Sequence, residues 1–156
     1  MELALARVLH VLAVVLWIGG VAMVTTVLLP AVRRFKDPSE AVAFFEQIEG
    51  RFAWQSRITT LLAGVSGFYM LHLLGWERLF SAHYWWIHAM IAVWALFTLM
   101  LFVFEPLFLH RWFHARAAQA PRSTFQVIQG LHWGLLTISL VTVAGAVAGS
   151  HGWFWW

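Results

Sequence analysis

Two histidines, His10 and His88, stand in apolar stretches where a membrane helix would carry hydrocarbon side chains. His88 lies in the stretch WWIHAM, about one turn after a pair of tryptophans, and His10 lies in LHVLAVVLWIGG. An imidazole inside hydrocarbon is costly, so such a residue is a candidate for a functional site. Imidazole nitrogens bind transition metals and haem iron, and metal ligation is therefore the chemistry that these residues predict first.

The composition of the chain predicts an integral membrane protein. Its 156 residues are 62% hydrophobic and only 11% charged, and the mean hydropathy is +0.75. We expect an all-α, four-helix bundle of up-down topology, formed by residues 1–156 as a single transmembrane domain. The chain has no cysteine, which excludes disulfides and thiolate metal sites. Apolar runs of bilayer-spanning length predict spans at roughly 3–32, 54–75, 84–110 and 125–149.

Basic residues are concentrated after the first and third predicted spans. By the positive-inside rule both of these segments are cytoplasmic, so both termini are expected to be periplasmic in a multi-pass protein of the bacterial inner membrane. Topology accounts for the net charge of +3, and no nucleic-acid partner is expected. The basic residues are Arg33, Arg34, Lys36 and Arg51 in the first segment and Arg111, Arg116 and Arg122 in the second.

A short amphipathic helix is predicted on the cytoplasmic side, between the first two spans. Asp37, Pro38 and Glu40 form a typical helix start, with a capping carboxylate, a proline at the first helical position and an acidic residue in the first turn. The helix is expected to lie along the membrane surface with its apolar face toward lipid. That face is formed by Val42, Phe45, Ile48 and Phe52.

The depths of His10 and His88 suggest that they act together. At about 1.5 Å per residue from the outer ends of their spans, His10 lies about 10 Å deep and His88 about 6 to 8 Å deep. The first and third helices of an up-down bundle lie diagonally, with axes about 11 to 14 Å apart. This gap suits a haem b whose iron is bound by both imidazoles, with Arg7 or Arg78 pairing with a propionate. The alternative is two independent histidines, His10 hydrogen-bonded to a helix carbonyl and His88 to interfacial water.

Two further sets of polar residues leave other functions open. Thioethers lie beside imidazoles in Met70-Leu71-His72 and His88-Ala89-Met90, so His72, Met70 and Met90 are alternative ligands for copper. On the cytoplasmic half, Arg57 and Glu105 are expected to pair or to reach the interface. Together with His132 they would otherwise bind a quinone, a propionate or a proton in transit.

Three stretches resemble known membrane proteins. The segment LHVLAVVLWIGGVAMVTTVLLPAV resembles the first helix of the copper-resistance-D-like family, and GRFAWQSRITTLLAGVSGFYML resembles its second. WWIHAM is similar to the third helix of the related HemJ-type protoporphyrinogen oxidases, in which Trp-x-His-Ala-Lys is typical. The resemblance implies a four-helix protein that binds haem b, with His10 and His88 at the matching positions. Met90 replaces the lysine of the oxidases and QGLHWG replaces their Asn-Glu pattern, which speaks against protoporphyrinogen oxidation.

These observations predict a membrane-integral b-type cytochrome. It would transfer single electrons between a partner at the outer face and a quinone, a redox protein or another acceptor, and it would then be an oxidoreductase. The alternatives are a copper-handling transport protein and a cofactor-free accessory subunit of a larger membrane complex. The expected partners are the lipid bilayer, an electron donor or acceptor and, as a further alternative, other copies of the chain.

Overall fold

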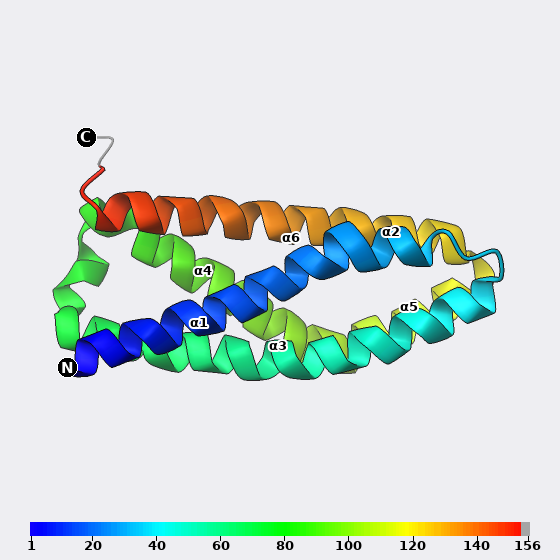
Figure 1. Ribbon diagram of the computed structural model, residues 1–156, viewed down its shortest axis with the longest axis horizontal. Coiled ribbons are helices and arrows are strands. Elements are labelled where there is room, and N and C mark those ends of the chain that lie inside the picture. Colours follow the sequence, from blue (N-terminus) through cyan, green and yellow to red (C-terminus); the bar gives the residue numbers. More distant parts are fainter. Residues whose placement is uncertain (154–156) are drawn as a thin grey trace.

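A computed structural model describes residues 1–153, and within that range helices and short connections are the only elements. Figure 1 shows long helices lying side by side, with the N-terminus and the C-terminal end of α6 at one end of the molecule. The connections from α2 to α3 and from α5 to α6 lie at the other end. In chain order the elements are α1 (Glu2–Met23), η1 (Val24–Leu28), α2 (Leu29–Val32), α3 (Pro38–Leu74), η2 (Trp76–Phe80), η3 (Ala82–Tyr84), α4 (Trp85–Leu99), η4 (Met100–Leu109), α5 (His110–Gln119) and α6 (Pro121–Ser150).

Within residues 1–153, four helical stretches are long and apolar enough to cross a membrane, which confirms the predicted all-α class and the four candidate spans. Exposed apolar side chains cover these stretches, as at Val65 and Val141, which are 69% and 63% exposed. Such a surface is compatible with contact to a lipid bilayer. The four stretches are Glu2–Val32, Ser39–Leu74, Ala82–Leu109 and Pro121–Ser150.

The second stretch joins two predicted elements, the short amphipathic helix that begins after Asp37 and the span predicted at 54–75. The Asp37 carboxylate accepts hydrogen bonds from the backbone N–H and the hydroxyl of Ser39, both at 2.7 Å, and these bonds lower the pKa of Asp37. From this cap α3 continues without a break to Leu74, because no proline or turn sequence separates the amphipathic segment from the second span. The predicted short helix is therefore the first part of α3.

The apolar face of this first part of α3 packs against protein. Phe45 is only 5% exposed, and its ring lies 5.5 Å from that of Phe113 in α5 and 5.4 Å from that of Phe125 in α6. These three rings belong to a core cluster that also contains Leu29 of α2. The prediction that this face lies along lipid is wrong. The face packs against protein because α5 and the first turns of α6 also extend to this end of the molecule (Figure 1).

The middle of the bundle is held by contacts between aromatic rings and small residues. The rings of Trp17 in α1 and Phe97 in α4 meet edge to face, with centroids 4.9 Å apart. Trp94 of α4 lies over Gly64 of α3, where a Cβ atom would come within 2.6 Å of the indole. The Trp94 indole N–H donates to the Thr60 carbonyl at 2.9 Å. A glycine at position 64 therefore allows α4 to approach α3 closely.

Candidate functional site

His10 is held against α3 by a hydrogen bond to the backbone. Its Nδ1 lies 2.9 Å from the Ala63 carbonyl oxygen and 3.2 Å from the Ser66 hydroxyl, which itself donates to Leu62. Because a carbonyl oxygen only accepts, Nδ1 carries the proton and Nε2 has the free lone pair. Gly67 makes room for the ring, since a Cβ there would lie 3.1 Å from the His10 Cε1 atom. This arrangement fixes both the orientation and the tautomer of the imidazole.

His88 is held by a different part of the chain. Its Nε2 lies 2.8 Å from the carbonyl oxygen of Leu79 in η2, and the residue is exposed. Nε2 therefore carries the proton, and the free lone pair belongs to Nδ1. His88 also lines a shallow pocket together with Phe80 and Trp85. Of the two arrangements expected for these histidines, this geometry is closer to the one in which each is hydrogen-bonded separately. The partner of His88 is a carbonyl oxygen and not the expected water.

No hydrogen bond or ring contact joins His10 to His88 in the part of the chain that the structure describes. Nor do three or more His, Asp or Glu residues within residues 1–153 gather where they could hold a metal ion. Arg7 is exposed on α1, one turn before His10. Arg78 donates from Nε to the Leu74 carbonyl at 3.1 Å and lies over the ring of Tyr84, so it closes the C-terminal end of α3.

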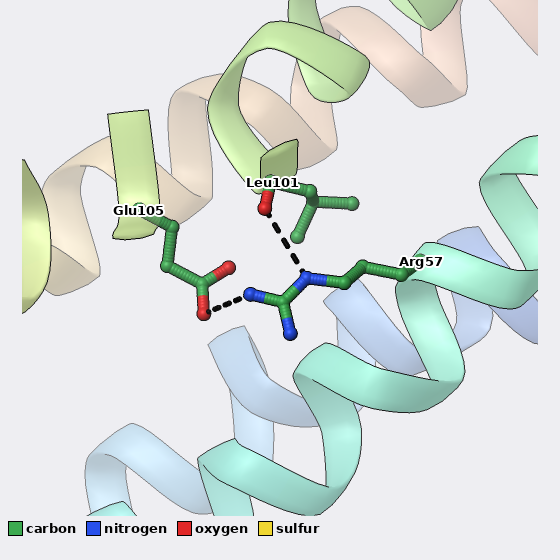
Figure 2. A network of polar contacts seen from close by, with 3 residues as sticks. All are labelled: Arg57, Leu101 and Glu105. Atoms are coloured by element: carbon green, nitrogen blue, oxygen red, sulfur yellow. Dashed lines mark hydrogen bonds and ion pairs between the residues drawn. The ribbon is translucent and has the colours of Figure 1, made fainter. Parts of the chain in front are cut away.

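A polar contact with two hydrogen bonds joins α3 to η4. Figure 2 shows the Arg57 side chain reaching from α3 to two groups on η4. Its Nη2 atom is 2.9 Å from Oε1 of Glu105, and its Nε donates to the Leu101 carbonyl at 3.2 Å. The side chains of Arg57 and Glu105 are 28% and 24% exposed. The structure therefore confirms the predicted pairing of Arg57 with Glu105.

Pro106 explains why Leu101 needs a donor from another helix. In a π-helix each N–H pairs with the carbonyl five residues earlier, and η4 is π-helical. Pro106 has no N–H, so the carbonyl five residues before it, that of Leu101, loses its helical partner. Arg57 supplies the missing donor, as neighbouring helices do where a proline interrupts a membrane helix. Arg57 thus stabilises the interrupted helix as well as binding Glu105.

The remaining predicted site residues do not join this network. His132 hydrogen-bonds through Nδ1 to the Ile128 carbonyl of its own helix at 2.9 Å. His72 is exposed and accepts a hydrogen bond from the Trp76 indole at 3.4 Å. Met70 and Met90 are half-buried on α3 and α4.

Sequence reasoning missed a set of polar atoms inside the bundle. The Trp17 indole N–H and the hydroxyls of Ser56 and Thr60 have no hydrogen-bond partner within the described part of the chain. These residues are 4%, 2% and 0% exposed. The pairing of His10 with Ala63, and the contact that a Cβ at Gly20 would make with Phe52, place Trp17 beside this part of α3. Ser56 and Thr60 are four residues apart and therefore lie on one face of α3. Hydroxyl residues at this helical spacing would have indicated the set from the sequence.

Replacing Thr60 with valine is expected to stabilise the protein by about 1 kcal/mol, because valine has a similar shape and removes a buried hydroxyl without a partner. The matched control is Thr59→Val, since the Thr59 hydroxyl donates to the Gln55 carbonyl at 3.0 Å and its removal offers no such gain. Equilibrium unfolding of both variants in mixed micelles measures the difference. A destabilised Thr60→Val protein would mean that the hydroxyl is hydrogen-bonded after all.

Comparison with known proteins adds no relative: no family model matches the chain, and no curated protein or solved structure is significantly similar to it.

Proposed function

We propose that this chain is a membrane-integral haem b protein in which His10 would bind the iron. Its task would be the transfer of single electrons between a partner at the outer face and a quinone or another acceptor. When bound, haem supplies the one-electron chemistry, while the protein sets its potential through the ligands and the low dielectric. The chain would then act as an oxidoreductase.

The observation that carries this proposal is the state of the His10 ring. Histidines that bind metals almost always donate their second ring nitrogen to a carboxylate, a carbonyl or water, which fixes the ring and raises the basicity of the coordinating nitrogen. His10 has this arrangement, with Nδ1 on the Ala63 carbonyl and Nε2 free. The resemblance of the first three spans to haem-binding four-helix proteins supports the same residue.

His88 fits the role of a second ligand less well. As it lies, its Nε2 is bonded to the Leu79 carbonyl, and His10 and His88 are fixed by different elements. His88 would bind iron through Nε2 only after giving up that bond. We therefore assign His10 as the principal ligand and keep His88 as the candidate for the second.

The proposal includes an orientation in the membrane. The helices are arranged as an up-down bundle in the bacterial inner membrane, with both termini periplasmic. The distribution of charge supports this orientation, because the basic residues near the ends of α2 and α5 lie away from the N-terminus (Figure 1). The haem would then lie near the outer leaflet, at the depth of His10.

An absorption spectrum of the full-length protein, purified in mild detergent from cells supplied with haem precursors, tests the proposal. The wild-type protein is expected to show a Soret band, and His10→Ala to lose at least about nine-tenths of the haem per polypeptide, because its fixed ligand is gone. If His88 is the second ligand, His88→Ala keeps haem but changes from a low-spin to a high-spin spectrum. His83→Ala is the control, because His83 is an exposed histidine of η3 that is not proposed as a ligand, and it is expected to leave the spectrum unchanged.

Two results would contradict the assignment. A His10→Ala protein with the wild-type spectrum would exclude His10 as a ligand. A colourless wild-type protein would exclude haem, and retention of copper by that preparation would point to the copper alternative. That alternative lacks a comparable site here, because His72 is exposed and engaged by Trp76.

A further inference from the structure

A small cavity lies at the end of the molecule where α2 turns into α3 and where α6 begins. Its volume is about 130 Å³, and three cationic side chains line it: Arg33, Lys36 and Arg122. Its apolar lining includes Val32 and Phe125, which are 1% and 3% exposed and belong to the core cluster of this end. The cavity therefore combines a fixed apolar floor with a positively charged rim.

The three cations have no acidic partner among the residues whose side chains the structure describes. The ion pairs formed there are Arg57 with Glu105 and His114 with Glu46, neither of which involves the cavity. Arg33 donates to the amide oxygen of Gln129 at 2.6 Å, which is a neutral group. Like charges that share one cavity repel each other, and a bound anion would remove that repulsion.

The first turn of α6 adds to the positive potential of the cavity. Pro121 and Arg122 of this turn line the cavity, and the N-cap residue Ala120 provides no side-chain cap. Pro121 has no N–H and the Thr124 N–H donates to the Ala120 carbonyl, so the N–H groups of Arg122 and Ser123 are those without an acceptor in the helix. The helix dipole places partial positive charge at the same point. The helix start and the three side chains therefore favour the same kind of ligand.

We propose that the cavity between the α2–α3 turn and the start of α6 binds a phosphate group through Arg33, Lys36 and Arg122. Two guanidinium forks match the oxygens of a tetrahedral oxyanion, and the lysine adds a point charge. A cavity of about 130 Å³ is several times the space that one water needs and has room for one phosphate group. The site does not depend on the proposed haem.

The phosphate has two chemically equivalent sources, an anionic lipid headgroup and a free phosphate compound. Glu2–Val32 has 31 residues and at about 1.5 Å per residue is about 46 Å long, close to the ~45 Å thickness of a bilayer with its headgroups. Arg33 and Lys36 follow directly and would reach headgroup level. Basic pockets between membrane helices on the cytoplasmic side bind such headgroups.

The test compares two triple variants of the full-length protein. Arg33→Gln/Lys36→Gln/Arg122→Gln removes the cations of the cavity, and Arg34→Gln/Arg51→Gln/Arg111→Gln removes the same charge from residues that do not line it. One arm measures the thermal midpoint in inorganic phosphate and in chloride at matched ionic strength. The other measures by native mass spectrometry which lipid stays bound after extraction from vesicles of phosphatidylglycerol and phosphatidylcholine.

The wild-type protein and the control triple variant are expected to bind phosphate or phosphatidylglycerol in at least one arm. The cavity triple variant is expected to bind the same ligand at least about tenfold more weakly. Retained phosphatidylglycerol without a phosphate effect identifies a headgroup site, and a phosphate-dependent midpoint without retained lipid identifies a site for free phosphate. Equal losses in both triples, or no binding by wild type in either arm, overturn the proposal. The wild-type measurements test the proposal even if the cavity triple variant does not fold. In that case the single variant Arg122→Gln takes its place.

Discussion

Replacing Phe45 with alanine is expected to lower the free energy of unfolding by about 3 to 5 kcal/mol, the usual cost of removing a buried phenylalanine ring. Phe45 is 5% exposed and contacts the rings of Phe113 and Phe125, so its loss leaves a cavity shared by α3, α5 and α6. Equilibrium unfolding of the full chain in mixed micelles, followed by far-UV circular dichroism, measures the change.

The adjacent residue provides the control. Phe44 is 38% exposed, and among the described side chains its ring contact is with Phe35, at 5.3 Å. Phe44→Ala is therefore expected to cost about 1 kcal/mol. The pair separates two arrangements of the first part of α3. If the apolar face of residues 38–53 rested on lipid, Phe45→Ala would cost no more than Phe44→Ala, and the core at this end of the molecule would be disproved.

The sequence predicted this helix but not its partners. The cap at Asp37 and the apolar spacing were visible in the chain, because capping and helical periodicity are local properties. Whether Phe45 meets lipid or protein depends on how far α5 and α6 extend beside it, which no local pattern records. The four spans were predicted for the same reason as the cap, since apolar length is read directly from the chain.

The candidate site was predictable only in part. The cost of a polar group in hydrocarbon singled out His10, Arg57 and Glu105, and two of these do pair. Depth along a helix, however, says nothing about rotation around it. His10 and His88 were placed at similar depths, but their rings bond to the Ala63 and Leu79 carbonyls, on different elements.

The ion pair between α3 and η4 is the second place where a single change has a large expected effect. Arg57→Gln is expected to destabilise the protein by about 3 kcal/mol, because it removes the guanidinium from Glu105 and the donor from the Leu101 carbonyl together. Both side chains are about a quarter exposed, which places the value at the low end for a buried pair. The measurement is unfolding in mixed micelles, as for Phe45.

A double-mutant cycle measures the contribution of the ion pair between Arg57 and Glu105 to the free energy of unfolding. Glu105→Gln and Arg57→Gln are expected to be non-additive, with a coupling of at least about 1 kcal/mol, because each removes the same ion pair. Arg57→Lys keeps a cation for Glu105 but loses the fixed Nε donor, and it is expected to cost about 1 kcal/mol. Additive single variants would show that the contact in Figure 2 contributes little to stability.

A change at Pro106 allows the hydrogen bond from Arg57 to the Leu101 carbonyl to be tested separately from the ion pair with Glu105. Pro106→Ala restores the N–H that Leu101 lacks, so the carbonyl no longer needs a donor from α3. In that background Arg57→Lys is expected to cost nothing measurable, while Arg57→Gln keeps the part of its cost that comes from Glu105. If Arg57→Lys costs the same with and without Pro106, the hydrogen bond to Leu101 does not compensate for the proline. The energetic role of Arg57 would then be the ion pair alone.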